Sequence, residues 1–171
     1  MSIHSNFLDS TIRVKEIVDE NFQDYKKPSM LISSVSCDFK CLKELNMDIS
    51  ICQNMKISKL PNKVVSIKSI FERYISNPIT KAVILGGLEP ILQFDEIINL
   101  ISYFRFNGCD DDFVIYTGYN PDEIEDKTQE FKKFKNIIIK YGRFIPNCTS
   151  KYDKVLGVSL SSENQHGLKL S

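Results

Sequence analysis

Hydrophobic residues in the middle of the chain recur with a helical period. The pattern at 67–75 predicts an amphipathic helix with Ser66 as its N-cap. The same spacing returns at 94–104 and predicts a second helix. Asn120-Pro121 is typical of a helix start, because asparagine caps the first turn and proline fits it, so we expect a third helix from there.

Short apolar runs alternate with these helices and predict strands. The runs lie at Ile12–Val18, Met30–Val35, Ala82–Leu85, Phe113–Tyr116, Ile137–Ile139 and Val155–Leu160. Strands that alternate with helices favour an α/β fold on a parallel sheet with right-handed crossovers. With 171 residues in all, we expect one small domain over residues 11–171 after a flexible N-terminus at residues 1–10.

Glycines follow three successive predicted strands. Gly86-Gly87, Gly118 and Gly142 each stand where a strand ends. Ligands of parallel sheets bind beyond the carboxyl ends of the strands, and a glycine there lets the backbone approach the ligand closely. Ordinary loop glycines are the alternative for any one position. The recurrence at three strands favours a binding site at this edge.

Composition narrows the class of partner. Lys and Arg total 22, as do Asp and Glu, so the net charge is zero and gives no electrostatic case for nucleic acid or an anionic membrane. No stretch is apolar enough for a membrane span, and the first ten residues lack the pattern of a signal peptide. We therefore expect a cytoplasmic protein, whose thiols stay reduced.

Three of the five cysteines lie close together in a stretch without hydrophobic period. Cys37, Cys41 and Cys52 fall within residues 36–64, whereas Cys109 and Cys148 stand apart. The usual C-x2-C pairs and four ligands of structural zinc sites are missing. Three thiolates on a four-iron cluster would leave one iron open for a substrate. Composition and spacing leave both a metal site and buried free thiols open.

The cysteine pattern resembles that of radical S-adenosylmethionine (SAM) enzymes. Cys37 and Cys41 form C-x3-C, and Cys52 opens a C-x-N that ends at Asn54. Their usual spacing is C-x3-C-x2-C, but Glu44 occupies the third place here, and an insertion carries the third cysteine to Cys52. The segment Gly86-Gly87-Leu88-Glu89-Pro90 looks like their Gly-Gly-Glu-Pro motif with Leu88 inserted.

Later segments are similar to the activating enzymes of anaerobic ribonucleotide reductases. These are Tyr116–Tyr119, Gly142–Phe144 and Ser162–Gln165, although Tyr141 stands where an acidic residue often precedes the glycine. The resemblance covers residues 12–165 and implies a partial (βα) barrel-like parallel sheet. Arg143 could meet the SAM carboxylate or a partner, or form a surface ion pair.

The resemblance implies a function and a set of site residues. Cys37, Cys41 and Cys52 would hold a 4Fe-4S cluster, with no catalytic side chain beyond these ligands. Glu89 would assist the ammonium of SAM beside Gly86 and Gly87, and Gln53 would lie where the family contacts adenine. The remaining implied cofactor-binding residues are Asn54, Thr117 and Gly118.

The implied reaction is reductive cleavage of SAM, which places a glycyl radical on the catalytic subunit of an anaerobic ribonucleotide reductase. A flavodoxin- or ferredoxin-like protein would donate the electron. Three alternatives remain: another radical SAM reaction on a peptide or small molecule, a non-catalytic iron–sulfur or zinc protein, and an α/β binding module with free thiols. The Gly86–Pro90 motif favours SAM chemistry over the last two.

Overall fold

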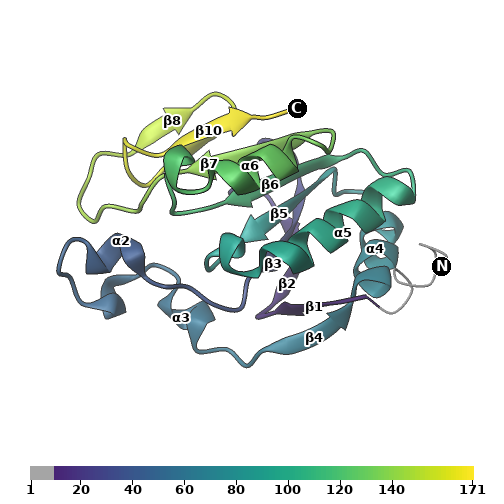
Figure 1. Cartoon of the computed structure of the whole chain (residues 1–171), viewed down its shortest axis with the longest axis horizontal. Coiled ribbons are helices and arrows are strands. Elements are labelled where there is room, and N and C mark those ends of the chain that lie inside the picture. Colours follow the sequence, from purple (N-terminus) through teal and green to yellow (C-terminus); the bar gives the residue numbers. More distant parts are fainter. Residues whose placement is uncertain (1–9) are drawn as a thin grey trace.

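The computed structural model describes residues 10–171, so the predicted flexible N-terminus, except for Ser10, lies outside the described residues. The described chain is a mixed α/β domain around a six-stranded sheet with the order β10-β7-β6-β5-β3-β2 (Figure 1). Its strands are β2 (Ile17–Asn21), β3 (Ser29–Ser33), β5 (Ala82–Gly86), β6 (Asp112–Tyr116), β7 (Ile137–Tyr141) and β10 (His166–Lys169). The four central strands are parallel, whereas β2 and β10 pair antiparallel at the edges.

The other elements surround this sheet. The helices are α2 (Lys40–Lys43), α3 (Met55–Ser58), α4 (Ile67–Ser76), α5 (Phe94–Phe106) and α6 (Glu125–Phe131). Short 3-10 turns are η1 (Ile49–Ile51), η2 (Pro90–Gln93) and η3 (Pro121–Glu123). Two small antiparallel sheets pair β1 (Thr11–Val14) with β4 (Lys63–Ser66) and β8 (Lys151–Asp153) with β9 (Val158–Leu160).

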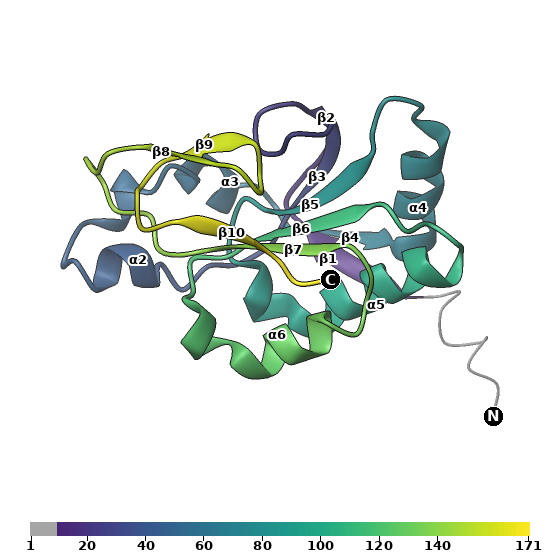
Figure 2. The same cartoon turned by 90° about the horizontal axis from the view of Figure 1, so that it is seen from above.

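The central strands are covered on both faces. Helices α5 and α6 lie on one face, and the β8–β9 hairpin lies on the other (Figure 2). Helix α4 packs against α5 in the core of the helical face. Every residue of β5 and β7 is buried, which explains why neither strand alternates between apolar and polar residues: β5 is apolar throughout, and β7 is apolar or aromatic except for Lys140. The larger core lies on the helical face, where the ring of Phe104 meets Phe71 and Phe113 edge-on at centroid distances of 5.1 and 5.2 Å.

Most predicted elements are present with small changes at their ends. The helices predicted at 67–75 and 94–104 are α4 and α5, and Ser66 is the N-cap residue of α4. The helix expected from Asn120 begins instead as the 3-10 turn η3, closed by a capping box between Asn120 and Glu123, and continues as α6. The α/β pattern therefore located the sheet and the helices that cover it.

Two expectations about the strands were wrong, and the expected parallel sheet is present only in its four central strands. The run Ile12–Val18 is two strands in different sheets, because the chain turns at Lys15, whose ammonium binds the carbonyls of Ser58 and Leu60. The run Val155–Leu160 contains only β9 and is followed by β10. The sheet over residues 10–171 is mixed rather than wholly parallel, since β2 and β10 pair antiparallel at its two edges, and it does not close into a barrel.

The described part of the chain contains no helix of the length and apolarity that crossing a membrane requires.

Candidate metal centre

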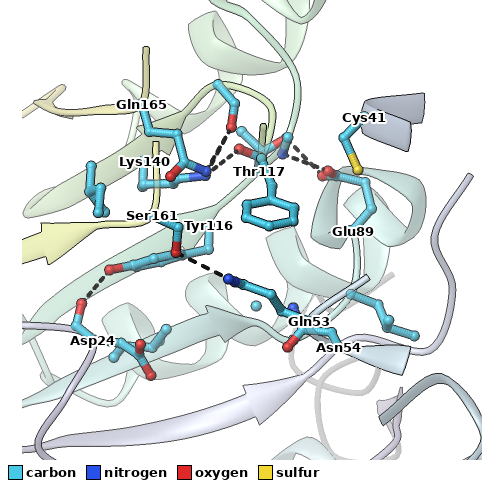
Figure 3. A pocket seen from close by; sticks show the side chains of 18 of the residues that line it. Asp24, Cys41, Gln53, Asn54, Glu89, Tyr116, Thr117, Lys140, Ser161 and Gln165 are labelled. Atoms are coloured by element: carbon cyan, nitrogen blue, oxygen red, sulfur yellow. Dashed lines mark hydrogen bonds between the residues drawn. The ribbon is translucent and has the colours of Figure 1, made fainter. Parts of the chain in front are cut away.

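A cavity of about 290 Å³ lies at the carboxyl ends of β5, β6 and β7 (Figure 3). Figure 1 places α2, which contains Cys41, and α3, which follows Cys52, at the same end of the sheet. All of the site residues expected from the sequence line this cavity: Cys37, Cys41, Cys52, Gln53, Asn54, Gly86, Gly87, Glu89, Thr117 and Gly118. The fold thus brings together residues 36–64, which we call the cysteine loop, and two strand ends, while the ligand that each site residue would contact stays a prediction.

The three cysteines are held in short, irregular turns. The thiol of Cys37 accepts a hydrogen bond from the backbone N–H of Phe39 at 3.3 Å, and Phe39 has a positive φ of 54°. Cys41 lies within α2, and Cys52 follows η1 as its C-terminal cap. All three are half-buried and free of disulfides. Such turns explain why residues 36–64 carry no regular hydrophobic period.

The thiols lie close enough to influence one another's ionisation. Burial raises the pKa of Cys37 to about 12, with smaller contributions from neighbouring negative charges that include Cys41. Burial also raises the pKa of Cys41, and the charge of Cys52 adds to that shift. Metal binding requires thiolates, so the positive charge of iron would be needed to displace these protons.

The donor set suits a four-iron cluster better than a single metal ion. Within residues 10–171, no three Cys, His, Asp or Glu side chains lie close enough to share one ion. A four-iron cluster is wider than one ion and binds each thiolate at a different iron. Cys109 and Cys148 do not line the cavity, so three thiols face it without a fourth. This arrangement fits a cluster with one iron left open.

Charged and polar contacts fasten the first part of the cysteine loop to the strand ends. Tyr119 donates its hydroxyl to Asp38 at 2.6 Å. Arg143 forms a bidentate pair with Glu44 at 2.5 and 2.9 Å and another with Glu123, with both contacts at 2.6 Å. Bidentate pairs fix orientation as well as attraction. We call this set, completed by Lys40, the loop clamp.

Lys40 completes the loop clamp from the cysteine side. It lies one residue before Cys41, and its ammonium pairs with Glu123. The Arg143 guanidinium is the main cause that holds the pKa of Glu123 well below its usual range, and Lys40 contributes further. Of the alternatives for Arg143, the structure therefore favours the ion pair. The SAM carboxylate would have to displace two carboxylates to reach it.

Glu89 joins two strand ends through its buried carboxylate. It accepts hydrogen bonds from the Gly118 N–H at 2.8 Å, the Thr117 hydroxyl at 2.8 Å and the Ile91 N–H at 3.1 Å. Burial raises its pKa, whereas these three donors lower it. The sequence predicts that Glu89 assists a ligand's ammonium. The structure adds a positioning function, because Glu89 holds the β5 and β6 ends together.

The paired glycines have a structural reason that differs from the expected one. Gly87 has a φ of +72°, and a Cβ there would come within 2.8 Å of the Ser33 hydroxyl oxygen. The backbone of β5 therefore approaches β3 closely as it turns into the motif. The Ser33 hydroxyl is buried beside this turn and has no hydrogen-bond partner in the described chain. Gly87 therefore allows a close approach to Ser33, and it also lines the cavity, where its approach to a ligand stays a prediction.

Sequence reasoning missed several residues that line the cavity. Asp24, Tyr116, Ser161 and Gln165 contribute to its polar wall, and Lys140 projects into it from β7 (Figure 3). The signal for Lys140 was present, because a lysine inside the run Ile137–Tyr141 interrupts an otherwise apolar strand. A buried lysine in such a strand is rare and requires compensation.

Comparison with known proteins identifies the family. The search of curated proteins finds no match to this chain. A family model described as a 4Fe-4S single cluster domain matches residues 29–166. This match covers most of the chain and includes the three cysteines of the cavity, all four parallel strands and the loop clamp. An iron–sulfur cofactor agrees with the three free thiols, and the chain belongs to the family of 4Fe-4S single cluster domains.

Proposed function

We propose that this iron–sulfur protein is a radical SAM enzyme. The observation that supports it most is the position of the cysteines: they share one cavity with the Gly86–Pro90 turn and with the β6 and β7 ends. A protein that used its cluster for electron transfer alone would have no need of a cavity beside it. Three thiols without a fourth leave a coordination position for SAM.

The cluster, when bound, would supply one electron that breaks a carbon–sulfur bond of SAM, giving methionine and a 5′-deoxyadenosyl radical. The chain's own residues bind the cluster and SAM, orient them, and shield them from solvent. Cys37, Cys41 and Cys52 hold the cluster at the cavity wall. Glu89 keeps Thr117 and Gly118 against the β5 end, which fixes the shape of the cavity. A flavodoxin- or ferredoxin-like protein would supply the electron.

We further propose that the radical passes to a protein, the glycyl-radical subunit of an anaerobic ribonucleotide reductase. A hydrogen atom would move from a backbone glycine to the 5′-deoxyadenosyl radical. Large apolar side chains support a protein partner: Leu45, Ile49 and Ile51, which are 44, 43 and 44% exposed, lie in the cysteine loop. Partly apolar surfaces are typical of interfaces. Another radical SAM reaction, on a peptide or a small molecule, is the alternative.

The proposal is tested by mixing the anaerobically reconstituted, reduced protein with SAM and a glycyl-radical reductase from the same genome. We expect a doublet glycyl-radical signal in electron paramagnetic resonance, absent when Cys41→Ala replaces the wild type. If SAM is cleaved but no glycyl-radical protein acquires the signal, the activating function is wrong and the alternative substrate classes replace it. If SAM is not cleaved at all, the radical SAM assignment itself fails.

A further inference from the structure

Lys140 is a buried cation on the cavity side of the sheet. It is 6% exposed and lies in β7 between residues that pack against the helices. Side chains alternate along a strand, so Lys140 shares the face of Ile138, which belongs to the smaller core under the β8–β9 hairpin. From this face the side chain reaches the cavity beside Thr117 and Gln165 (Figure 3).

The ammonium of Lys140 has fewer partners than it can bind. It donates to the carbonyl of Gly142 at 2.9 Å, and the carbonyl of Thr117 is at the longer distance of 3.5 Å. Over residues 10–171, no carboxylate forms an ion pair with it. Burial accordingly lowers the pKa of Lys140 to about 8. A buried charge without a counter-ion is costly, so this ammonium would gain from an anionic ligand.

The cavity offers an anion no other cationic side chain. Among the described residues that line it, Lys140 is the only Lys, Arg or His. The nearby Arg143 is already paired with Glu44 and Glu123. The Thr117 carbonyl is 3.5 Å from the Lys140 ammonium, and the Thr117 hydroxyl donates to Glu89, so the ammonium lies near the Gly86–Pro90 turn in the cavity that the cysteines also line. A ligand anion held by Lys140 would therefore lie on the cluster side of the cavity.

The ammonium of Lys140 donates to backbone carbonyls and carries one positive charge. That single charge matches the single negative charge of a carboxylate. A phosphate carries more charge and more acceptor atoms, and no second cation or arginine fork is available for it here. We propose that Lys140 binds the carboxylate of the methionine portion of SAM. This inference rests on the proposed function, and it assigns the amino-acid end of the ligand to the β7 side of the cavity.

The test compares two ligands and two proteins by calorimetry under anaerobic conditions. The ligands are SAM and its decarboxylated analogue, and the proteins are the cluster-loaded wild type and Lys140→Met, which keeps the length but not the charge. We expect Lys140→Met to bind SAM about tenfold to a hundredfold more weakly, because a charge-assisted hydrogen bond is lost. Both proteins should bind the decarboxylated analogue equally, since it lacks the group that Lys140 recognises.

Iron content and the cluster's electron paramagnetic resonance signal must be equal in the two proteins for this comparison. If Lys140→Met does not hold the cluster, Lys140→Gln replaces it and should show the same selective loss for SAM. Unchanged SAM affinity in the variant, or an equal loss for both ligands, would overturn the assignment while leaving SAM binding by the wild type intact. A wild type that binds no SAM would overturn the proposed function, and this assignment with it.

Discussion

Residues 37–45 of the cysteine loop are fastened to the strand ends by charged side chains, whereas residues 46–60 are held by few contacts. The first segment carries Cys37 and Cys41, and the loop clamp joins it to the ends of β6 and β7. Leu42, in the same segment, is fully buried. Two of the three thiols are therefore positioned by the fold.

The second segment carries Cys52 and contains no buried residue. Its contact with the cavity wall is a hydrogen bond of 3.4 Å from the Ser161 hydroxyl to Gln53 (Figure 3). Lys15 holds its far end, by donating to the Ser58 carbonyl at 3.0 Å and the Leu60 carbonyl at 2.6 Å. Cluster binding would therefore help to fix the position of this segment, because few protein contacts hold Cys52. This segment would therefore supply one thiol to the cluster without adding a buried residue to the core.

The largest expected effect is loss of the cluster when any one thiol of the cavity is removed. Cys37→Ala, Cys41→Ala and Cys52→Ala should each abolish a stable four-iron cluster after anaerobic reconstitution, measured by iron content and electron paramagnetic resonance. Cys109→Ala and Cys148→Ala are the matched controls and should retain it, because neither lines the cavity. A full cluster in Cys52→Ala would show that the second segment provides no ligand.

Breaking the loop clamp should have the next largest effect. Arg143→Gln removes both bidentate pairs and a hydrogen bond to the Gly118 carbonyl at 3.0 Å. We expect the free energy of unfolding to fall by about 2 kcal/mol, measured by chemical denaturation. The control is Arg73→Gln, whose pair with Asp19 is exposed on both sides and should cost less than about 0.5 kcal/mol. Equal losses in the two variants would argue against a special role of the clamp.

Acid should weaken the loop clamp, because Glu123 must be ionised to pair with Arg143 and Lys40. The pKa of Glu123 is held below its usual range, so its contribution to stability is present above the unfolded value of about 4.3 and is lost as the pH falls below it. Glu123→Gln should therefore be about 1 kcal/mol less stable than wild type near neutral pH, and this difference should shrink below about pH 4. Glu130→Gln, which loses an exposed pair with Lys133, serves as the control. A difference that grew on acidification would contradict the assignment.

The smallest effect is expected in the second segment. Gln53→Ala removes a long, exposed hydrogen bond and should change the stability of the cluster-free protein by less than about 0.5 kcal/mol. Ser161→Ala removes the same contact from the other side and should match it. A loss above about 1 kcal/mol in either variant would mean that this segment is held more firmly than its contacts indicate.

The helices and strands that were predicted from the sequence are those with a clear local pattern of apolar residues. Helical periods found α4 and α5, and apolar runs found β5, β6 and β7, because central parallel strands are buried on both faces. The cysteine spacing and the Gly86–Pro90 motif pointed to the residues that line the cavity. The helices and strands are encoded by neighbouring residues, whereas the site residues were identified through the family that these motifs resemble.

Long-range features could not be predicted in the same way. The antiparallel edges β2 and β10 depend on pairings that one sequence does not encode locally. The clamp joins Glu44 to Arg143, which are 99 residues apart, and surface charges have many possible partners. Lys140 was visible as a lysine in an apolar strand, but its lack of a counter-ion became clear only from its surroundings.

The most direct test of the central claim is to measure 5′-deoxyadenosine after the reconstituted protein is reduced and given SAM without oxygen. We expect 5′-deoxyadenosine and methionine to form together, and Cys41→Ala, measured in parallel, to form neither. This measurement tests whether SAM is cleaved in the cavity beside the cluster, since a protein that only transfers electrons would bind iron and leave SAM intact. A protein that holds a four-iron cluster at Cys37, Cys41 and Cys52 but yields no 5′-deoxyadenosine would contradict the account.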